Sequence, residues 1–271
     1  MKPSASAVIL ASVRAAVLFY LLGMLLEGIG KIWPPMGYLL RFVLFSFLTC
    51  LLIRRLAGSW KLTLTDCRIL PFSLHTKGIM TAVLLPVLFF LVETEFSQGH
   101  WSIHQNPAAH VLGPVFRAIF YSGFCSGIVE EMMFRGYLAK LSEQRWGTKH
   151  ALWLPSILFA FGHFRPGMNL LLFMFQFALY LCIGCLLTIL TLQTGSVWNA
   201  VLVHSFWNLF VSGTSIVSVS SAPDSSALFT YVISAESPAA GLPQTMLLLF
   251  TCAILVFVSC ILLLTGKNES A

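Results

Sequence analysis

The sequence predicts an all-α, polytopic membrane protein with about eight transmembrane helices. Hydrophobic residues make up 58% of the chain and charged residues only 10%, and the mean hydropathy is +0.86. These values lie outside the usual balance of soluble domains. In addition, apolar stretches of about 20 residues, the length at which a helix crosses ~30 Å of hydrocarbon, follow one another along the chain. We therefore expect residues 1–271 to form a single transmembrane domain.

Eight stretches are predicted to span the membrane. They are residues 7–29, 36–53, 79–96, 113–138, 151–165, 169–193, 196–214 and 244–265. Arg41 interrupts the second stretch, and the fifth is short. The first is too long for the apolar region of a secretory signal peptide and contains Arg14, so we expect it to be the first span.

The distribution of basic residues predicts that both termini lie in the cytoplasm. With the N-terminus inside, ten Lys and Arg residues fall on the cytoplasmic side, whereas only Lys31 and Arg165 fall outside. The formal charge of +6 is thus explained by membrane topology, and we expect no nucleic-acid partner. Basic residues in the segment 54–78 suit anionic lipid head groups. The expected location is the inner membrane if the source is bacterial, or the endoplasmic reticulum if it is a eukaryote.

Two other groups of residues resemble binding sites but have simpler interpretations. Cys182-x-x-Cys185 has the spacing of a metal site, yet it lies in an apolar span, and core packing is favoured. His100 and His104 would share a helix face, with His110 nearby, in a predicted external segment. We favour a belt of Trp and His at the membrane interface over a metal site there.

Three polar motifs lie within the predicted spans. They are Glu130-Glu131-x-x-x-Arg135, Phe159-x-x-x-His163 and His204-x-x-x-Asn208. Ionisable side chains at membrane depth are costly and are therefore a functional hypothesis by default. Each motif alone would more often be structural, but together they supply the groups that a hydrolytic site uses.

Helical spacing predicts a different role for each carboxylate. Glu131 and Arg135 are four residues apart, so we expect a structural ion pair. Glu130 is rotated about 100° from Glu131 on a helix and has no cation in its own motif, so it is the candidate general base.

The two histidine motifs predict how the rest of the site is built. His204 and Asn208 share one helical face and can both donate hydrogen bonds to a developing oxyanion. Phe159 would pack beside His163 and limit water. A hairpin turn near Trp146-Gly147 would bring Glu130 and His163 to the same depth, nearer the cytoplasmic face.

At these residues the sequence resembles the CPBP (ABI) family of intramembrane proteases, which includes the type II CAAX prenyl endopeptidases. The family patterns EExxxR, FxxxH and HxxxN appear in order as VEEMMFRGYL, FAFGHF and HSFWNL. The resemblance covers about a third of the chain, and we expect a catalytic core over about residues 113–214.

The resemblance implies that Glu130 and His163 activate a water for attack on a peptide bond, while His204 and Asn208 hold the oxyanion. Glu131, Arg135 and Phe159 would support them. The family has also been described as metal-dependent, and one zinc ion on Glu130, His163 and His204 is the alternative. We favour the metal-free mechanism because an amide suits oxyanion stabilisation better than zinc ligation.

The expected substrate is a membrane-associated peptide or protein, and the resemblance to CAAX endopeptidases implies a lipidated, CAAX-like end. Two other functions use the same residues differently. A scaffold or bacteriocin-immunity protein would bind a membrane partner without cleaving it. A proton-coupled transporter would relay protons through Glu and His, but the sequence has no inverted repeat of the kind that many transporters carry.

Overall fold

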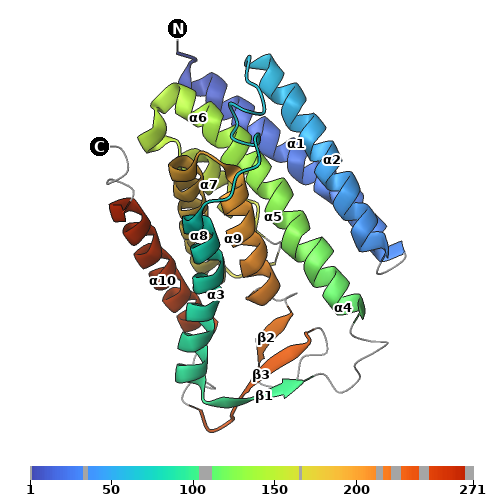
Figure 1. The fold of residues 1–271 in the computed structure, drawn as a ribbon, viewed down its shortest axis with the longest axis vertical. Coiled ribbons are helices and arrows are strands. Elements are labelled where there is room, and N and C mark those ends of the chain that lie inside the picture. The colour runs from blue at the N-terminus through green and yellow to red at the C-terminus, as the bar shows by residue number, and fades with distance from the viewer. Residues whose placement is uncertain are drawn as a thin grey trace.

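The chain folds into a mostly helical bundle, seen in a computed structural model that describes residues 2–32, 36–103, 112–164, 167–211, 216–220, 227–237 and 244–265. Three long helices come first: α1 (Ala5–Ile32), α2 (Met36–Ser59) and α3 (Thr76–Ser97). The start of α1 and the end of the last helix, α10 (Gln244–Thr265), lie at the same end of the bundle (Figure 1). This end is called the terminal end below.

Four helices are long and apolar enough to cross a membrane, which makes the chain a multi-pass membrane protein. They cover Ala5–Ile29, Met36–Ser59, Thr76–Glu95 and Leu170–Thr194, and they correspond to four of the eight predicted spans. Leu249–Thr265 is a shorter apolar helix.

The other predicted spans are not confirmed. The predicted span 151–165 contains only the nine-residue helix α7 (Trp153–Phe161), which reaches about 14 Å at the helical rise of 1.5 Å per residue. The predicted span 196–214 contains the 14-residue helix α9 (Val197–Phe210). Helices of this length suit the interior of a bundle rather than a complete crossing.

Residues 112–146 form one continuous helical path with two π-helical stretches. The path consists of α4 (Leu112–Phe116), η1 (Arg117–Gly123), α5 (Phe124–Glu131), η2 (Met132–Leu138) and α6 (Ala139–Trp146), and η1 and η2 are the π-helical parts. π-helical turns are rare and are frequently found at functional sites. Here the two stretches directly flank α5, the helix that carries Glu130 and Glu131.

The predicted hairpin after residue 146 is present. Gly147 adopts a φ of +78°, which ends α6 in a conformation that favours glycine. A short 3₁₀ turn, η3 (Thr148–His150), then leads into α7. The chain returns through α8 (Leu170–Thr194), and Ser196 caps the start of α9 by accepting a hydrogen bond from the amide of Trp198.

Helix α9 lies at the centre of the bundle, packed against α3, α5 and α8. The helices α1 and α2 pair with each other on one side of α5, and α10 packs on α8. Contact between α5 and α9 is close because Gly127 has no side chain: a Cβ atom there would overlap with Ser205 Oγ. This close approach sets how the polar residues of α5 and α9 meet.

A small sheet departs from the all-α prediction. Strands β1 (Gly99–Ile103) and β3 (Phe229–Ile233) pair antiparallel, and β2 (Val217–Ser220) pairs parallel to β3, in the order β1-β3-β2. The sheet lies at the end of the bundle opposite the terminal end (Figure 1). Strands β1 and β3 pair because they lie side by side in space, although more than 120 residues separate them.

The less favoured alternative, in which His100 and His104 would share a helix face, does not describe His100. His100 lies on β1, opposite Val232, while His104 and His110 lie outside the described residues. A strand turns successive side chains to opposite faces, so the helical spacing has no meaning for His100.

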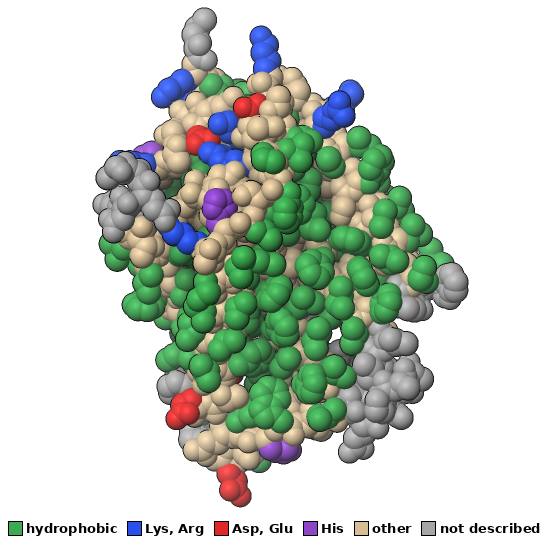
Figure 2. Space-filling model, in the orientation of Figure 1, with side chains coloured by type: hydrophobic (Ala, Val, Ile, Leu, Met, Phe, Trp, Pro, Cys, Tyr) green, Lys and Arg blue, Asp and Glu red, His purple; other side chains and the backbone are tan. Residues whose placement is uncertain are grey.

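Basic side chains gather at the terminal end, as Figure 2 shows. The segment between α2 and α3 crosses this end and is fixed to the helices below it. Arg68 forms two hydrogen bonds with the carboxylate of Glu143 on α6, at 2.9 and 3.0 Å. Trp198 and Asn199 on α9 donate hydrogen bonds to the carbonyl oxygens of Ile69 and Ser73. These contacts hold α6 and α9 at a fixed distance on this side of the site.

Candidate active site

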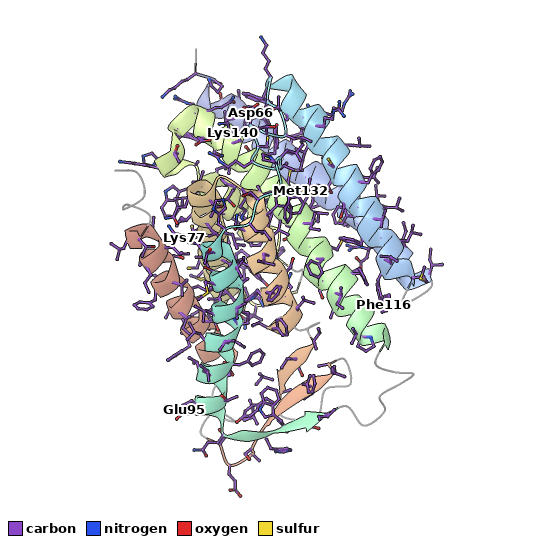
Figure 3. All side chains as sticks on the ribbon, in the orientation of Figure 1. Asp66, Lys77, Glu95, Phe116, Met132 and Lys140 are labelled. Atoms are coloured by element: carbon purple, nitrogen blue, oxygen red, sulfur yellow. The ribbon has the colours of Figure 1, made fainter. Side chains whose placement is uncertain are left out.

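One cavity of about 680 Å³ brings the predicted site residues together. Its walls come from α3, α5, α7, α8, α9 and α10, and its lining includes Glu130, Phe159, His163, His204 and Asn208. Figure 3 labels Met132, two residues after Glu130, at a height between Lys140 at the terminal end and Phe116 farther down the bundle. The cavity is enclosed by helices of the bundle, where polar side chains are costly unless they are paired.

Glu131 is the centre of a buried hydrogen-bonded chain. Its Oε1 accepts a hydrogen bond from Arg135 Nη1 at 2.8 Å, so the predicted ion pair is present, and both side chains are fully buried. The same oxygen lies 2.7 Å from His204 Nδ1. The carboxylate can only accept, so Nδ1 carries the hydrogen and His204 presents its other nitrogen, Nε2, away from Glu131.

Removing one partner of the Glu131–Arg135 pair would leave a buried charge without compensation, which typically costs about 3–5 kcal/mol. The pair is therefore a structural requirement of the site as well as the anchor of His204.

Phe159 is the aromatic centre of the site. The guanidinium of Arg135 lies over its ring, with the Cζ atom 4.2 Å from the ring centroid, a cation–π geometry. The rings of His163 and His204 meet it edge-on, with centroids at 4.7 and 5.9 Å. The ring is 1% exposed and contacts both histidines, whereas the sequence predicted its contact with His163 only.

His163 lies just beyond the end of α7, not within a helix that continues to residue 165. Its Nδ1 is 2.9 Å from the carbonyl oxygen of Phe159. A carbonyl oxygen only accepts, so this bond also fixes the tautomer: Nδ1 carries a hydrogen, and Nε2 is the acceptor of the neutral ring. Gly162 permits this turn to pack on α1, because a Cβ atom there would overlap with the hydroxyl of Tyr20.

Glu130 has a different environment from Glu131, as its helical position predicts. The Oε2 atom is buried and receives no hydrogen bond from any described residue. Electrostatic interactions with His204, Glu131, Arg135 and Arg41 act on this carboxylate. A buried carboxylate oxygen that faces a cavity and has no donor of its own is available to a water molecule or a substrate.

Asn208 lines the cavity, but part of its amide is already used. Its Nδ2 donates a hydrogen bond to the carbonyl oxygen of Ser122, in the π-helical stretch η1, at 2.8 Å. The amide nitrogen carries two hydrogens, and the bond to Ser122 fixes the orientation of the amide in the cavity wall. The sequence predicted that His204 and Asn208 share a helical face, but it did not predict the contact of Asn208 with η1.

The alternative zinc site would consist of Glu130, His163 and His204. The donor types, one carboxylate and two imidazoles, suit zinc, and His204 has the carboxylate partner that zinc-binding histidines use. However, within the described parts of the chain no group of three His, Cys, Asp or Glu is placed to hold a metal ion.

Several lining residues were not predicted. Tyr180 on α8 stacks on the ring of His163, with centroids 3.7 Å apart and planes 19° from parallel. Gln176, one turn earlier on the same helix, and Thr251 on α10 also line the cavity. A signal in the sequence was Gln176-x-x-x-Tyr180, two polar side chains on one face in the apolar first half of α8.

A second, apolar groove lies beside the cavity, between α3 and α10. It has a volume of about 670 Å³ and includes Leu84, Leu88, Phe257 and Ile261. Leu85 on α3 lines both spaces, so the groove and the cavity adjoin at this side chain.

Comparison with known families agrees with this geometry. Residues 112–210 match the family model described as "Type II CAAX prenyl endopeptidase Rce1-like". The matched range runs from α4 to the end of α9 and contains all seven residues of the three motifs. Neither a curated protein nor a solved structure matched the chain.

Proposed function

We propose, from the Rce1-like type II CAAX prenyl endopeptidase (CPBP/Abi) family domain that residues 112–210 form, that this chain is an intramembrane endopeptidase. The family indicates a CAAX-type protease and hence a peptide substrate. The observation that carries the proposal for this chain is the cavity, which gathers Glu130, His163, His204 and Asn208 from three separate segments.

In the proposed reaction, Glu130 and His163 bind a water molecule and orient it toward the substrate carbonyl carbon. Glu130 accepts a proton as the water attacks, and the same proton then passes to the nitrogen of the departing amine. The buried Oε2 of Glu130, with no donor among the described residues, supports this role. His163 Nε2 is the acceptor nitrogen of the ring and so can take a hydrogen bond from the same water.

The oxygen of the tetrahedral intermediate is proposed to lie between His204 and Asn208. Asn208 would donate from its side-chain amide, which the hydrogen bond to Ser122 holds in the cavity wall. His204 donates through Nε2 only when both ring nitrogens carry hydrogen, and Glu131 then forms an ion pair with the imidazolium. Donors fixed in advance by buried partners need little reorganisation when negative charge develops.

The proposed substrate is a membrane-associated peptide or protein with an apolar or lipid-modified end. The groove between α3 and α10 supports this, since it is apolar and shares Leu85 with the cavity. An alkyl chain or apolar segment in the groove would remain in lipid while the adjoining peptide reaches Glu130.

The proposed orientation places both termini in the cytoplasm. The terminal end of the bundle carries the gathered basic side chains, in agreement with the positive-inside rule. We propose an inner-membrane location if the source is bacterial.

The test is a proteolysis assay on the purified protein in detergent, with a fluorogenic, S-farnesylated peptide that ends in a CAAX sequence. We expect cleavage by the wild type and loss of most activity in Glu130→Gln, at unchanged thermal stability. Glu143→Gln, at the terminal end outside the cavity, is the matched control and should keep its activity. Equal cleavage by Glu130→Gln and the wild type would refute Glu130 as the base. Peptide binding without cleavage by any variant would favour the scaffold function instead.

A further inference from the structure

Gln176 differs from the other uncharged polar side chains of the cavity. Ser126 donates a hydrogen bond to the carbonyl oxygen of Tyr121 at 3.4 Å, and Tyr180 and Thr251 have partners in the protein. Gln176 forms no hydrogen bond with any residue that the structure describes, yet it lies in the cavity wall. Its neighbours in that wall, Leu179 and Ile183, are apolar.

A substrate that enters this cavity brings polar groups that need partners. A peptide must be extended at the bond that is cut, so its N–H and C=O groups lose the hydrogen bonds of a helix. In a water-poor interior, each unsatisfied group costs free energy. A glutamine amide has both a donor and an acceptor on one planar group, which matches the donor and acceptor of a peptide backbone.

The position of Gln176 fixes which part of the substrate it would meet. Gln176 and Tyr180 are four residues apart on α8, so they share a face and are about 6 Å apart along the helix axis. Tyr180 stacks on His163, beside the proposed water. An extended chain advances about 3.3 Å per residue, so this offset corresponds to about two residues.

We infer that Gln176 binds the backbone of the substrate, about two residues from the bond that is cleaved. Its Oε1 accepts from a substrate N–H, and its Nε2 donates to a substrate C=O. The inference rests on the proposed proteolytic function and adds a sequence-independent contact that selects extended peptides over helical ones. Gln176 is a substrate-binding residue in this scheme and takes no part in the proton transfers.

The first test is the kinetics of Gln176→Met on the farnesylated peptide. Methionine keeps the length of the side chain and removes its hydrogen bonds. We expect KM to rise about tenfold, the effect of losing one or two net hydrogen bonds, while kcat stays within about twofold. Gln193→Met is the matched control on the same helix: Gln193 donates to the carbonyl oxygen of Leu262 at 2.6 Å and does not line the cavity. This control should leave KM unchanged. An unchanged KM in Gln176→Met would overturn the inference.

The second test uses peptides in which one backbone amide at a time is replaced by an ester, which has no N–H. For one position about two residues from the scissile bond, we expect the ester to raise KM of the wild type and Gln176→Met to add little further. An equal effect of Gln176→Met on every ester peptide would indicate a general distortion and contradict a specific contact. If Gln176→Met folds poorly, the ester peptides still test the contact with the wild type alone. A wild type whose KM rises for none of the ester peptides would reject the contact.

Peptide binding to the Glu130→Gln variant, measured by fluorescence anisotropy, distinguishes failure of the proposed proteolytic function from failure of the Gln176 contact. If the wild type never cleaves but Gln176→Met weakens peptide binding about tenfold, the proposed function is refuted and the contact of Gln176 with the peptide is supported. Binding that is independent of Gln176 would reject the contact whether or not the wild type cleaves.

Discussion

His204 Nδ1 lies 2.7 Å from Oε1 of Glu131, a residue 73 positions earlier in the chain, and both side chains are buried. Glu131 therefore has two duties: it neutralises Arg135 within its own helical path, and it sets the tautomer and orientation of His204 on α9. A residue that couples an ion pair to a histidine links the stability of the bundle to the geometry of the site.

Substitutions at Glu131 should separate these two duties. Glu131→Gln leaves the charge of Arg135 unpaired and should lower the free energy of unfolding by about 3–5 kcal/mol. In the double variant Glu131→Met/Arg135→Met, an apolar pair replaces the ion pair, so much of the stability should return. Proteolysis should stay low in both variants because His204 has lost its partner. Thermal unfolding and cleavage rates measure the two effects, and a fully active double variant would show that Glu131 does not orient His204.

Much of this arrangement within single helices follows from the sequence. The i, i+4 spacing predicts the Glu131–Arg135 pair, the contact between Phe159 and His163, and the shared face of His204 and Asn208. The contacts of Glu131 with His204 and of Asn208 with Ser122 join residues 73 and 86 positions apart. Helical periodicity gives the face on which a residue lies but not which helix covers that face, so these contacts could not be predicted.

The π-helical stretches and the sheet were missed for related reasons. η1 and η2 have ordinary apolar composition, and their extra residue per turn is set by packing against α2, α7 and α9. Strands β1 and β3 pair across more than 120 residues. Hydropathy located the four long spans but counted α7 and α9 as crossings, because apolar residues in a bundle interior resemble those in lipid.

The Glu143 cluster predicts a pH dependence of stability at the terminal end. Partial burial opposes the charged form of this carboxylate, but hydrogen bonds from Thr148, Arg68 and Lys140 outweigh it and lower the pKa of Glu143 below its usual 4.5. A lowered folded-state pKa means that the stabilisation is complete above about pH 4.5 and is lost as the pH falls through the lower value.

We therefore expect the melting temperature of the wild type to fall below about pH 4.5 by more than that of Glu143→Gln. At pH 7 the variant should melt about 2–4 °C lower. Melting curves between pH 3 and 7 measure both effects, and proteolysis at pH 7 should be unchanged. Identical pH dependence of the two proteins would contradict the role of Glu143.

Metal dependence is tested by removal of bound metal. The proposed reaction uses Glu130 and His163 without a metal ion, so treatment with a strong chelator should leave the cleavage rate within about twofold and elemental analysis should find no stoichiometric zinc. His163→Ala and His204→Ala, analysed in the same way, serve as controls for adventitious binding. Stoichiometric zinc whose removal abolishes activity, and whose return restores it, would replace the glutamate mechanism with a zinc mechanism.

Asn208 should act on the transition state more than on substrate binding. An amide aimed at a developing oxyanion strengthens as negative charge forms, and loss of one such donor typically lowers kcat by ~10²–10³-fold. Asn208→Ala should therefore lower kcat and kcat/KM by similar factors at nearly unchanged KM.

The variant also loses the hydrogen bond to Ser122, which is worth about 1 kcal/mol. Asn208→Asp controls for the space that alanine leaves, because a carboxylate keeps the size of the side chain but has no hydrogen to donate to either oxygen. Equal loss of kcat in both variants, with melting temperatures that remain close to the wild type, supports oxyanion stabilisation. A raised KM at unchanged kcat would instead make Asn208 a substrate-binding residue.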